Sequence, residues 1–326
     1  MDQIEKQHSV RRIDSIDQFR GFAILLMVLA NYINDINTLP AWFKHASDIG
    51  YTFSDLVAPL FVFAIGLTFG MSFRRRYSRD GAWKTYNHFF SRNLALIGLG
   101  FLITLVGTYA SYYSSSTNWG LLQALGAAGL ITLPFIKVDA KFRWVFGVII
   151  LMLYQLLLDK YWMTQVINAA HNGPYGALSW GAMLIIATSL GDLYQQDENR
   201  SNLFWISIIL IAIGIFAGQI IPISKHRASA SYVVLSLGLS SLVFYFFHIM
   251  ENTYQYSLPI LSEWGKNSLL LYILHGVLLS ILLLPQNPHW YYNAPLWLIV
   301  FQASAVILIL SWIGVYFNKH NWNLTI

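Results

Sequence analysis

A histidine and an aspartate, His45 and Asp55, are the residues of this sequence best placed to do chemistry. They stand ten residues apart in a polar stretch that leads into a long apolar run. An imidazole has an unperturbed pKa of about 6.5 and can exchange protons near neutral pH. A carboxylate within reach would fix the tautomer of the ring and raise its basicity. Two other interpretations stay open: His45 as an interfacial residue beside Trp42 and Phe43, and Asp55 as a helix cap.

The composition of the chain is that of a membrane protein. Of its 326 residues, 56% are hydrophobic and only 11% are charged, whereas soluble globular proteins carry about 25% charged residues. Cysteine is absent, which excludes disulfides, thiolate metal sites and cysteine nucleophiles. The net charge of +5 is not accompanied by a basic stripe with stacking aromatics, so nucleic acid is not an expected partner.

Ten apolar runs are long enough, or nearly so, to cross a hydrocarbon core of about 30 Å as helices. They cover residues 18–34, 55–73, 93–111, 119–136, 143–159, 175–193, 202–221, 231–249, 267–285 and 296–317. We therefore predict an all-α polytopic membrane protein, a bundle of about ten transmembrane helices in a single domain over residues 1–326. The lipid bilayer is its expected surroundings.

Lysine and arginine are distributed unevenly between the alternate loops of this bundle. With the N-terminus in the cytoplasm, 16 of the 20 fall on the cytoplasmic side. They are Lys6, Arg11, Arg12, Arg20, Arg74, Arg75, Arg76, Arg79, Lys84, Arg92, Lys137, Lys141, Arg143, Arg200, Lys266 and Lys319. The positive-inside rule favours this orientation. It predicts both termini in the cytoplasm, His45 and Asp55 on the extracytoplasmic side, and a multi-pass protein of the inner, or plasma, membrane.

The other four, Lys44, Lys160, Lys225 and Arg227, fall on the extracytoplasmic side, and two of them stand close together. Lys225 and Arg227 belong to the predicted extracytoplasmic loop between the seventh and eighth apolar runs. Either the loop simply turns the chain, or these side chains bind an anionic group. At the other face, Arg20 stands three residues after Asp17 at the start of the first helix. Its planar guanidinium could hydrogen-bond phosphate, or it could pair with Asp17 and reach the headgroups.

Three polar residues are predicted within apolar helices. Asn31 ends the first helix, Gln123 opens the fourth, and His275 follows Asn267 by eight residues, about 12 Å of helical rise. Hydrocarbon offers no hydrogen-bond partners, so each must find one in the protein. Asn31 could orient a substrate or an imidazole, or it could join two helices, and Gln123 carries the same ambiguity. His275 is either functional or a neutral histidine bonded between helices.

Several common types of site are missing from the sequence. There is no Walker loop, no dinucleotide-binding glycine pattern after a strand and no nucleophile elbow. Histidines do not occur at the helical spacings that bind zinc, so no metal site is predicted.

The ordered motifs resemble the heparan-α-glucosaminide N-acetyltransferase family of transmembrane acyltransferases, in its compact bacterial form. The motifs are SIDQFRG at 15–21, NY at 31–32, WFKHA at 42–46, DLVAPLFVF at 55–63, GLLQ at 120–123, ISK at 223–225 and GKNSLLLYILH at 265–275. They keep their order over nearly the whole chain.

The resemblance implies transfer of acetyl from cytoplasmic acetyl-CoA to an amino sugar or related glycan acceptor across the membrane. His45 would be the base or a transient acetyl carrier, Asn31 would donate to the oxyanion, and Asp55 would orient His45. The residues expected toward acetyl-CoA are Arg20, Arg92, Asn267 and His275, and those toward the acceptor are Lys225 and Gln123. A homodimer is left open.

This sequence departs from the usual family pattern on the side where the acceptor would bind. Asp48-Ile49 stands where the family commonly has tryptophan and asparagine, Ala124 replaces an arginine, and the turn after Tyr32 lacks its usual glycines. The alternative function is a sugar or metabolite transporter whose path is lined by the same polar residues. Transporters often contain internal repeats, and no repeat is evident between the two halves.

Overall fold

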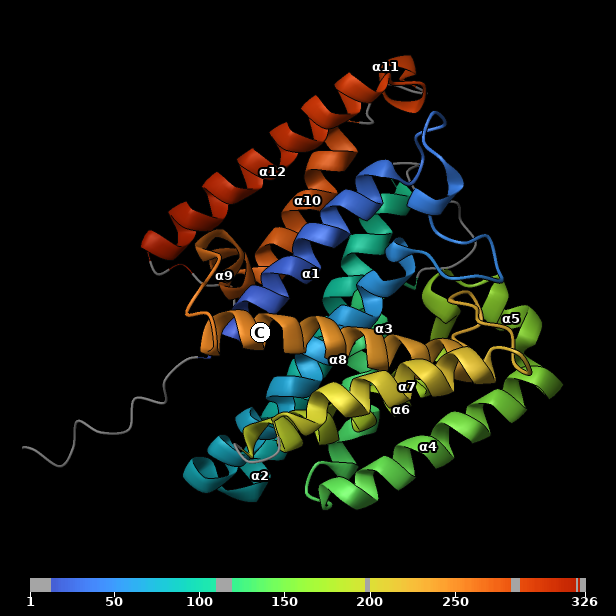
Figure 1. The fold of residues 1–326 in the computed structure, drawn as a ribbon, viewed down its shortest axis with the longest axis vertical. Coiled ribbons are helices and arrows are strands. Elements are labelled where there is room, and N and C mark those ends of the chain that lie inside the picture. Colours follow the sequence, from blue (N-terminus) through green and yellow to red (C-terminus); the bar gives the residue numbers. More distant parts are fainter. Residues whose placement is uncertain (1–12, 110–118, 197–199, 283–287, 321, 323–326) are drawn as a thin grey trace, which may run out of the picture.

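The computed structural model describes residues 13–109, 119–196, 200–282, 288–320 and 322, and these form helices and loops without a strand (Figure 1). The helices are α1 Asp14–Ile33, α2 Val57–Tyr109, α3 Leu121–Thr132, α4 Ala140–Leu157, α5 Met163–Ile167, α6 Gly173–Gln195, α7 Asn202–Ala217, α8 Ala230–Asn252, α9 Pro259–Lys266, α10 Ser268–Leu282, α11 His289–Tyr292 and α12 Leu296–Lys319. The predicted all-α class is confirmed over this part of the chain. The basic residues at 6, 11 and 12 and the ends of the predicted runs 93–111 and 267–285 lie outside it.

Helix α6 is the centre of the bundle and packs against α2, α3 and α4. Its residues from Ser179 to Gly191 are all buried. A helix that is apolar on every side can be accommodated only in such an interior position or in lipid. By contrast, α4 and α12 expose large apolar side chains such as Phe142, Trp297 and Phe301. Exposed apolar side chains of this size are unfavourable in water and are suited to a surface that faces lipid.

Helix α2 is a helical hairpin, because its backbone breaks at Gly81. This glycine has φ 78° and ψ 175°, outside the helical region. The rings of Phe69 and Phe89 nevertheless lie 5.0 Å apart, and Phe73 lies 5.1 Å from Tyr86. In a straight helix, residues twenty apart would be separated by about 30 Å, so the chain reverses at Gly81. The two predicted runs 55–73 and 93–111 are the two arms of this hairpin.

Within the described residues, six helices are long and apolar enough to cross a membrane, or seven if Pro259–Lys266 and Ser268–Leu282 act as one span bent by 89°. In that count α2 is a single element, although it holds two predicted runs, and Leu121–Phe135 and Asn202–Ala217 are shorter apolar helices. The structure therefore supports a multi-pass membrane protein with fewer certain spans than the ten predicted. The count of ten and the cytoplasmic location of both termini stay predictions.

Helices α1 and α9 cross with their backbones in contact, which fixes the N-terminal end of α1. A Cβ atom on Gly265 would lie 1.9 Å from the carbonyl oxygen of Asp17, and one on Gly21 would lie 1.9 Å from that of Leu261. Small residues are the usual means of such close approach between membrane helices. Polar bonds reinforce the crossing: the Ser262 hydroxyl donates to Asp14 Oδ1 at 2.7 Å.

Replacing Gly265 by alanine tests this crossing. We expect Gly265→Ala to lower the free energy of unfolding by about 3 kcal/mol, because the added methyl group meets backbone atoms that cannot rotate away. Gly98→Ala is the matched control, since nothing lies within 4 Å of a Cβ there and alanine favours the helix by up to about 1 kcal/mol. Thermal unfolding in detergent measures both. Equal stability of the two variants would contradict the close crossing.

Candidate active site

Asp55 is held at the start of α2 by a short 3₁₀ helix, Phe53–Leu56, and is fully buried. Its Oδ2 atom accepts three hydrogen bonds, from the backbone nitrogens of Thr52 at 3.0 Å and Ala46 at 3.2 Å and from the Thr52 hydroxyl at 3.1 Å. Oδ2 is thus the capping atom, as one interpretation of the sequence predicted. The Oδ1 atom remains available for another partner.

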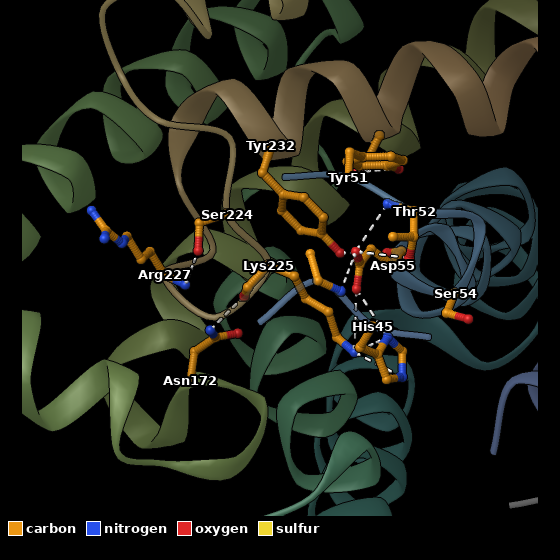
Figure 2. Close-up of polar contacts among 12 residues, drawn as sticks. His45, Tyr51, Thr52, Ser54, Asp55, Asn172, Ser224, Lys225, Arg227 and Tyr232 are labelled. Carbon is orange, nitrogen blue, oxygen red and sulfur yellow. Dashed lines mark hydrogen bonds and ion pairs between the residues drawn. The ribbon is translucent and has the colours of Figure 1, made fainter. Parts of the chain in front are cut away.

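That partner is His45. Its Nδ1 atom lies 2.9 Å from Asp55 Oδ1, with the histidine side chain 24% exposed (Figure 2). Because a carboxylate oxygen only accepts, Nδ1 carries the proton and Nε2 keeps a lone pair. The structure therefore brings together the two residues on which the sequence analysis relied. One carboxylate both caps the helix and orients the imidazole.

Lys225, from a loop 180 residues after His45, joins His45 and Asp55 in one polar cluster. Its Nζ atom lies 2.9 Å from Nδ1 and 3.2 Å from Nε2 of His45, and 3.9 Å from Asp55 Oδ1. Since Nδ1 has its proton on Asp55, Nε2 is the ring atom that can accept from the ammonium group. The sequence placed Lys225 on the same side as His45, but contact between residues 180 apart was not predicted.

Burial and charge set the protonation of the two groups in these loops. Burial lowers the pKa of His45; the hydrogen bond to Asp55 opposes this, and the charge of Lys225 lowers the pKa further. Burial also lowers the pKa of Lys225 to about 8, against the attraction of Asp55. At neutral pH the site therefore presents a neutral imidazole whose unprotonated Nε2 lies next to the Lys225 ammonium group. This is the state that a general base or a nucleophile requires.

The backbone around Lys225 is fixed by residues that the sequence analysis did not identify. The Asn172 amide donates to the carbonyl oxygen of Lys225 at 2.8 Å and accepts from the Trp180 indole at 3.0 Å. His171, Asn172 and Gly173 have φ values of 46°, 67° and 61° in succession. The Asn172-Gly173 pair was the available signal, because asparagine and glycine are the residues that adopt this left-handed conformation most readily.

Asn31 and His275 form a second polar pair. The Asn31 amide nitrogen lies 3.0 Å from His275 Nε2, and it joins the end of α1 to α10. Asn31 therefore meets an imidazole, as one alternative predicted, but the imidazole is that of His275. In the described part of the chain neither residue hydrogen-bonds to His45. Their predicted roles, at the oxyanion and toward acetyl-CoA, stay proposals.

The remaining predicted site residues are separated in the fold. Arg20 on α1 donates to the Thr68 hydroxyl at 2.8 Å and lies 3.8 Å from Asp17. Arg92 lies on the second arm of α2, where its Nε is buried without a hydrogen-bond partner. Asn267 is buried at the bend between α9 and α10. Asn267 donates to Asn318 of α12 at 2.5 Å. Gln123 accepts from Gly120 N at 3.0 Å, which closes the first turn of α3, and donates to the Thr104 hydroxyl at 3.4 Å.

Comparison with known protein families assigns the chain to one of them. A family model described as "Heparan-alpha-glucosaminide N-acetyltransferase, catalytic" matches residues 12–250, well over half of the chain, and this range includes His45, Asp55 and Lys225. The chain belongs to this family. The resemblance noted in the sequence is thereby confirmed, and the protein is a multi-pass membrane protein of an acetyltransferase family. Over the described ranges, no group of three or more metal-binding side chains gathers.

The individual relatives share 34% sequence identity or less with this chain over the aligned regions. The chain is 34% identical over 123 residues to human heparan-alpha-glucosaminide N-acetyltransferase, a match covering 35% of this chain and 17% of that protein. The mouse protein of the same name is 33% identical over 129 residues, covering 37% and 18%. GPI-anchored wall transfer protein 1 of Kluyveromyces lactis is 22% identical over 247 residues, covering 70% and 54%. The aligned region spans less than a fifth of either mammalian relative.

Replacing Asp55 by asparagine tests the orientation of His45. Asn keeps the size of the side chain but removes the charge. The pKa of His45 should therefore fall further, because the hydrogen bond and the charge of Asp55 both raise it. Imidazole chemical shifts followed by NMR over pH measure this. Asp80→Asn is the control, since Asp80 pairs instead with Arg76 and Arg79. An unchanged or raised pKa of His45 in Asp55→Asn would overturn the assignment.

Proposed function

We propose that this protein transfers acetyl from acetyl-CoA to an amino sugar or related glycan acceptor at the predicted extracytoplasmic face of the inner membrane. The observation that carries the proposal is the contact of His45 with both Asp55 and Lys225, in a chain that belongs to an acetyltransferase family. The acetyl donor, the acceptor and the role of His45 are the proposed parts.

Each residue of the cluster has a distinct task in this reaction. Asp55 holds the Nδ1–H of His45, so Nε2 faces the reacting groups with its lone pair. Nε2 removes the proton from the acceptor amine or hydroxyl as the acceptor attacks the thioester carbonyl. The new N–C or O–C bond forms, the C–S bond breaks, and the thiol leaves with a proton returned through His45. In the covalent variant Nε2 attacks the thioester carbonyl, so that the Nε2–C bond forms, the C–S bond breaks and the thiolate leaves. The acceptor then attacks the acetylimidazole, the Nε2–C bond breaks, and the released imidazole takes the acceptor proton.

The developing negative charge on the carbonyl oxygen needs a donor. The Lys225 ammonium already lies 3.2 Å from the His45 nitrogen that would face the substrate, which suits a fixed donor in a partly buried site. Asn31, the donor predicted from the resemblance, would take part only when its amide leaves His275. We therefore assign the role of oxyanion donor to Lys225, on the predicted acceptor side. Gln123, the other residue proposed toward the acceptor, closes the first turn of α3.

The donor would approach from the opposite face. Arg20, Arg92, Asn267 and His275 are the residues proposed to bind acetyl-CoA, two with guanidinium groups suited to phosphate. The buried Nε of Arg92 has no hydrogen-bond partner among the described residues, so a ligand oxygen would satisfy it. A path for the pantetheine arm along the bundle would then pass the Asn31–His275 pair before reaching His45.

Removal of the His45 imidazole tests the proposed reaction. We expect His45→Ala to lower transfer of labelled acetyl from acetyl-CoA to glucosamine by at least about 10²-fold, the contribution of a general base. Thermal stabilisation by acetyl-CoA should persist, about 2.7 kcal/mol at a hundred times the dissociation constant. His320→Ala, in an exposed residue of the C-terminal segment, is the control. Undiminished transfer by His45→Ala would refute the proposal, and sugar flux into liposomes without an acetyl donor would favour a transporter.

The pH dependence follows from the two protonation states. His45 must be neutral, so kcat/KM should rise as pH increases through its lowered pKa. Lys225 must be charged, so activity should fall as pH passes about 8. Lys225→Arg should move this alkaline limb upward, because a guanidinium stays protonated. Steady-state rates over pH measure both limbs, and an alkaline limb that does not move would exclude Lys225 as its source.

A further inference from the structure

Asp48 and Arg227 join the loop of His45 to the loop of Lys225. Asp48 Oδ1 accepts from the Ser224 hydroxyl at 2.8 Å and from Arg227 Nε at 3.0 Å, while Oδ2 accepts from the terminal nitrogen of Arg227 (Figure 2 shows Ser224 and Arg227). Two parallel bonds between guanidinium and carboxylate fix orientation as well as distance. The Gly50 nitrogen adds a backbone bond to the carbonyl oxygen of Ile223 at 2.9 Å.

The bonds of Asp48 fall on both sides of Lys225. Ser224 precedes Lys225 and Arg227 follows it by two residues, and the Arg227 nitrogen donates to the Ser224 hydroxyl at 3.1 Å to close the turn. Asp48 itself comes three residues after His45. The carboxylate therefore fixes the short turn that carries the ammonium group against the segment that carries the imidazole.

The two loops have separate supports apart from this bridge. The Lys225 loop is fixed to the helical bundle by Asn172 and by Tyr154, whose hydroxyl donates to the carbonyl oxygen of Arg227 at 2.7 Å. The His45 segment is fixed to the start of α2, where Ser54 donates to the carbonyl oxygen of Phe43 at 2.9 Å. Among the described residues, the polar bonds that join the two loops outside the reacting cluster are those of Asp48 and the one from Gly50.

Stability alone does not explain such a pair. The side chains of Arg227 and Asp48 are 21% and 35% exposed, and ion pairs open to solvent contribute about 0–1 kcal/mol. Charge gives a better reason. Arg227 would otherwise be a second cation next to Lys225, free to compete for Asp55. Asp48 neutralises Arg227 and directs it away from the cluster. It does so at a position where the sequence departs from the common family pattern.

We propose that Asp48 and Arg227 act as a clamp that holds the Lys225 ammonium against His45, which makes both of them positioning residues for the transfer reaction. This rests on the proposed function for its catalytic meaning, but the geometry it predicts is testable without any acetyl donor. The titratable and charged groups around His45 are Asp55, Lys225, His226 and His171. Of these, Lys225 and His226 lie in the turn that the clamp fixes, and Lys225 is the one that contacts His45.

The test removes the clamp without changing the net charge. In Asp48→Asn/Arg227→Gln a carboxylate and a guanidinium disappear together, so a change at His45 reports the position of Lys225. We expect the pKa of His45, measured by NMR, to rise, because the Lys225 charge lowers it. Lys225→Met should raise it as well, and adding the clamp substitutions to Lys225→Met should have no further effect. Such non-additivity identifies residues that act through one another.

The control is Asp35→Asn, an exposed carboxylate of the same loop region that bonds to Asn34, and it should leave the His45 pKa unchanged. Arg227→Lys is the milder variant if the double substitution does not fold, and it should shift the His45 pKa in the same direction. An unchanged pKa without the clamp, or an equal rise in the Lys225→Met background, would overturn the proposal.

Activity then supplies a separate readout. Loss of the clamp should lower kcat/KM by about tenfold to a hundredfold, as a small misplacement of a reacting group does, and should move the acid limb to higher pH. If His45→Ala keeps full transfer while the His45 titration still responds to the clamp, the proposed function fails and the clamp stands. If the titration does not respond while His45→Ala is inactive, the clamp fails and the function stands.

Discussion

The site depends on Asp55, whose two carboxylate oxygens are bound by different partners. A buried carboxylate is costly unless hydrogen bonds and a counter-charge satisfy it. Three donors from residues 46 and 52 satisfy Oδ2, whereas Oδ1 meets His45 and Lys225. The donors and the imidazole come from residues 45–52, whereas the ammonium group comes from the loop of Lys225, so the full set of partners of Asp55 forms only when these two segments come together.

The helices determine where this happens. Buried α6 packs against α2 and α4, and the segment before α6 carries Asn172 to the backbone of Lys225. At the other end, the contact of Gly265 with α1 fixes the first helix. The reactive groups thus lie on loops supported by a rigid scaffold, the usual arrangement for enzymes. The clamp of Asp48 and Arg227 fixes the position of the His45 loop relative to the Lys225 loop.

Local features of the site were predictable and long-range features were not. His45 and Asp55 are close in sequence and Asp55 stands at a helix start, so both residues could be named as candidates, but their contact is shown only by the structure. Lys225 could be placed on a side by charge counting, but contact across 180 residues depends on how α6 and α8 pack. Asn31 shows the limit most clearly: its need for a partner was evident, yet two imidazoles were available and the fold selects His275.

The same distinction holds for the helices. Hydrophobic runs predicted that helices would form, since burial of apolar residues determines this locally. They did not predict that residues between two runs would stay helical up to Gly81, nor the 89° bend before Ser268. A polar connection can be helix or loop with little difference in hydropathy. Asp48 was visible only as a departure from the family pattern, because its purpose lies in Arg227, far along the chain.

The most direct test of the central claim is a structure of the protein with a non-hydrolysable acetyl-CoA analogue. The account predicts the acetyl carbonyl carbon within about 3.5 Å of His45 Nε2, the separation expected for groups poised to react, with its oxygen toward Lys225. An analogue whose acetyl group ends at the Asn31–His275 pair, remote from His45, would contradict it and place the reaction at that second polar pair.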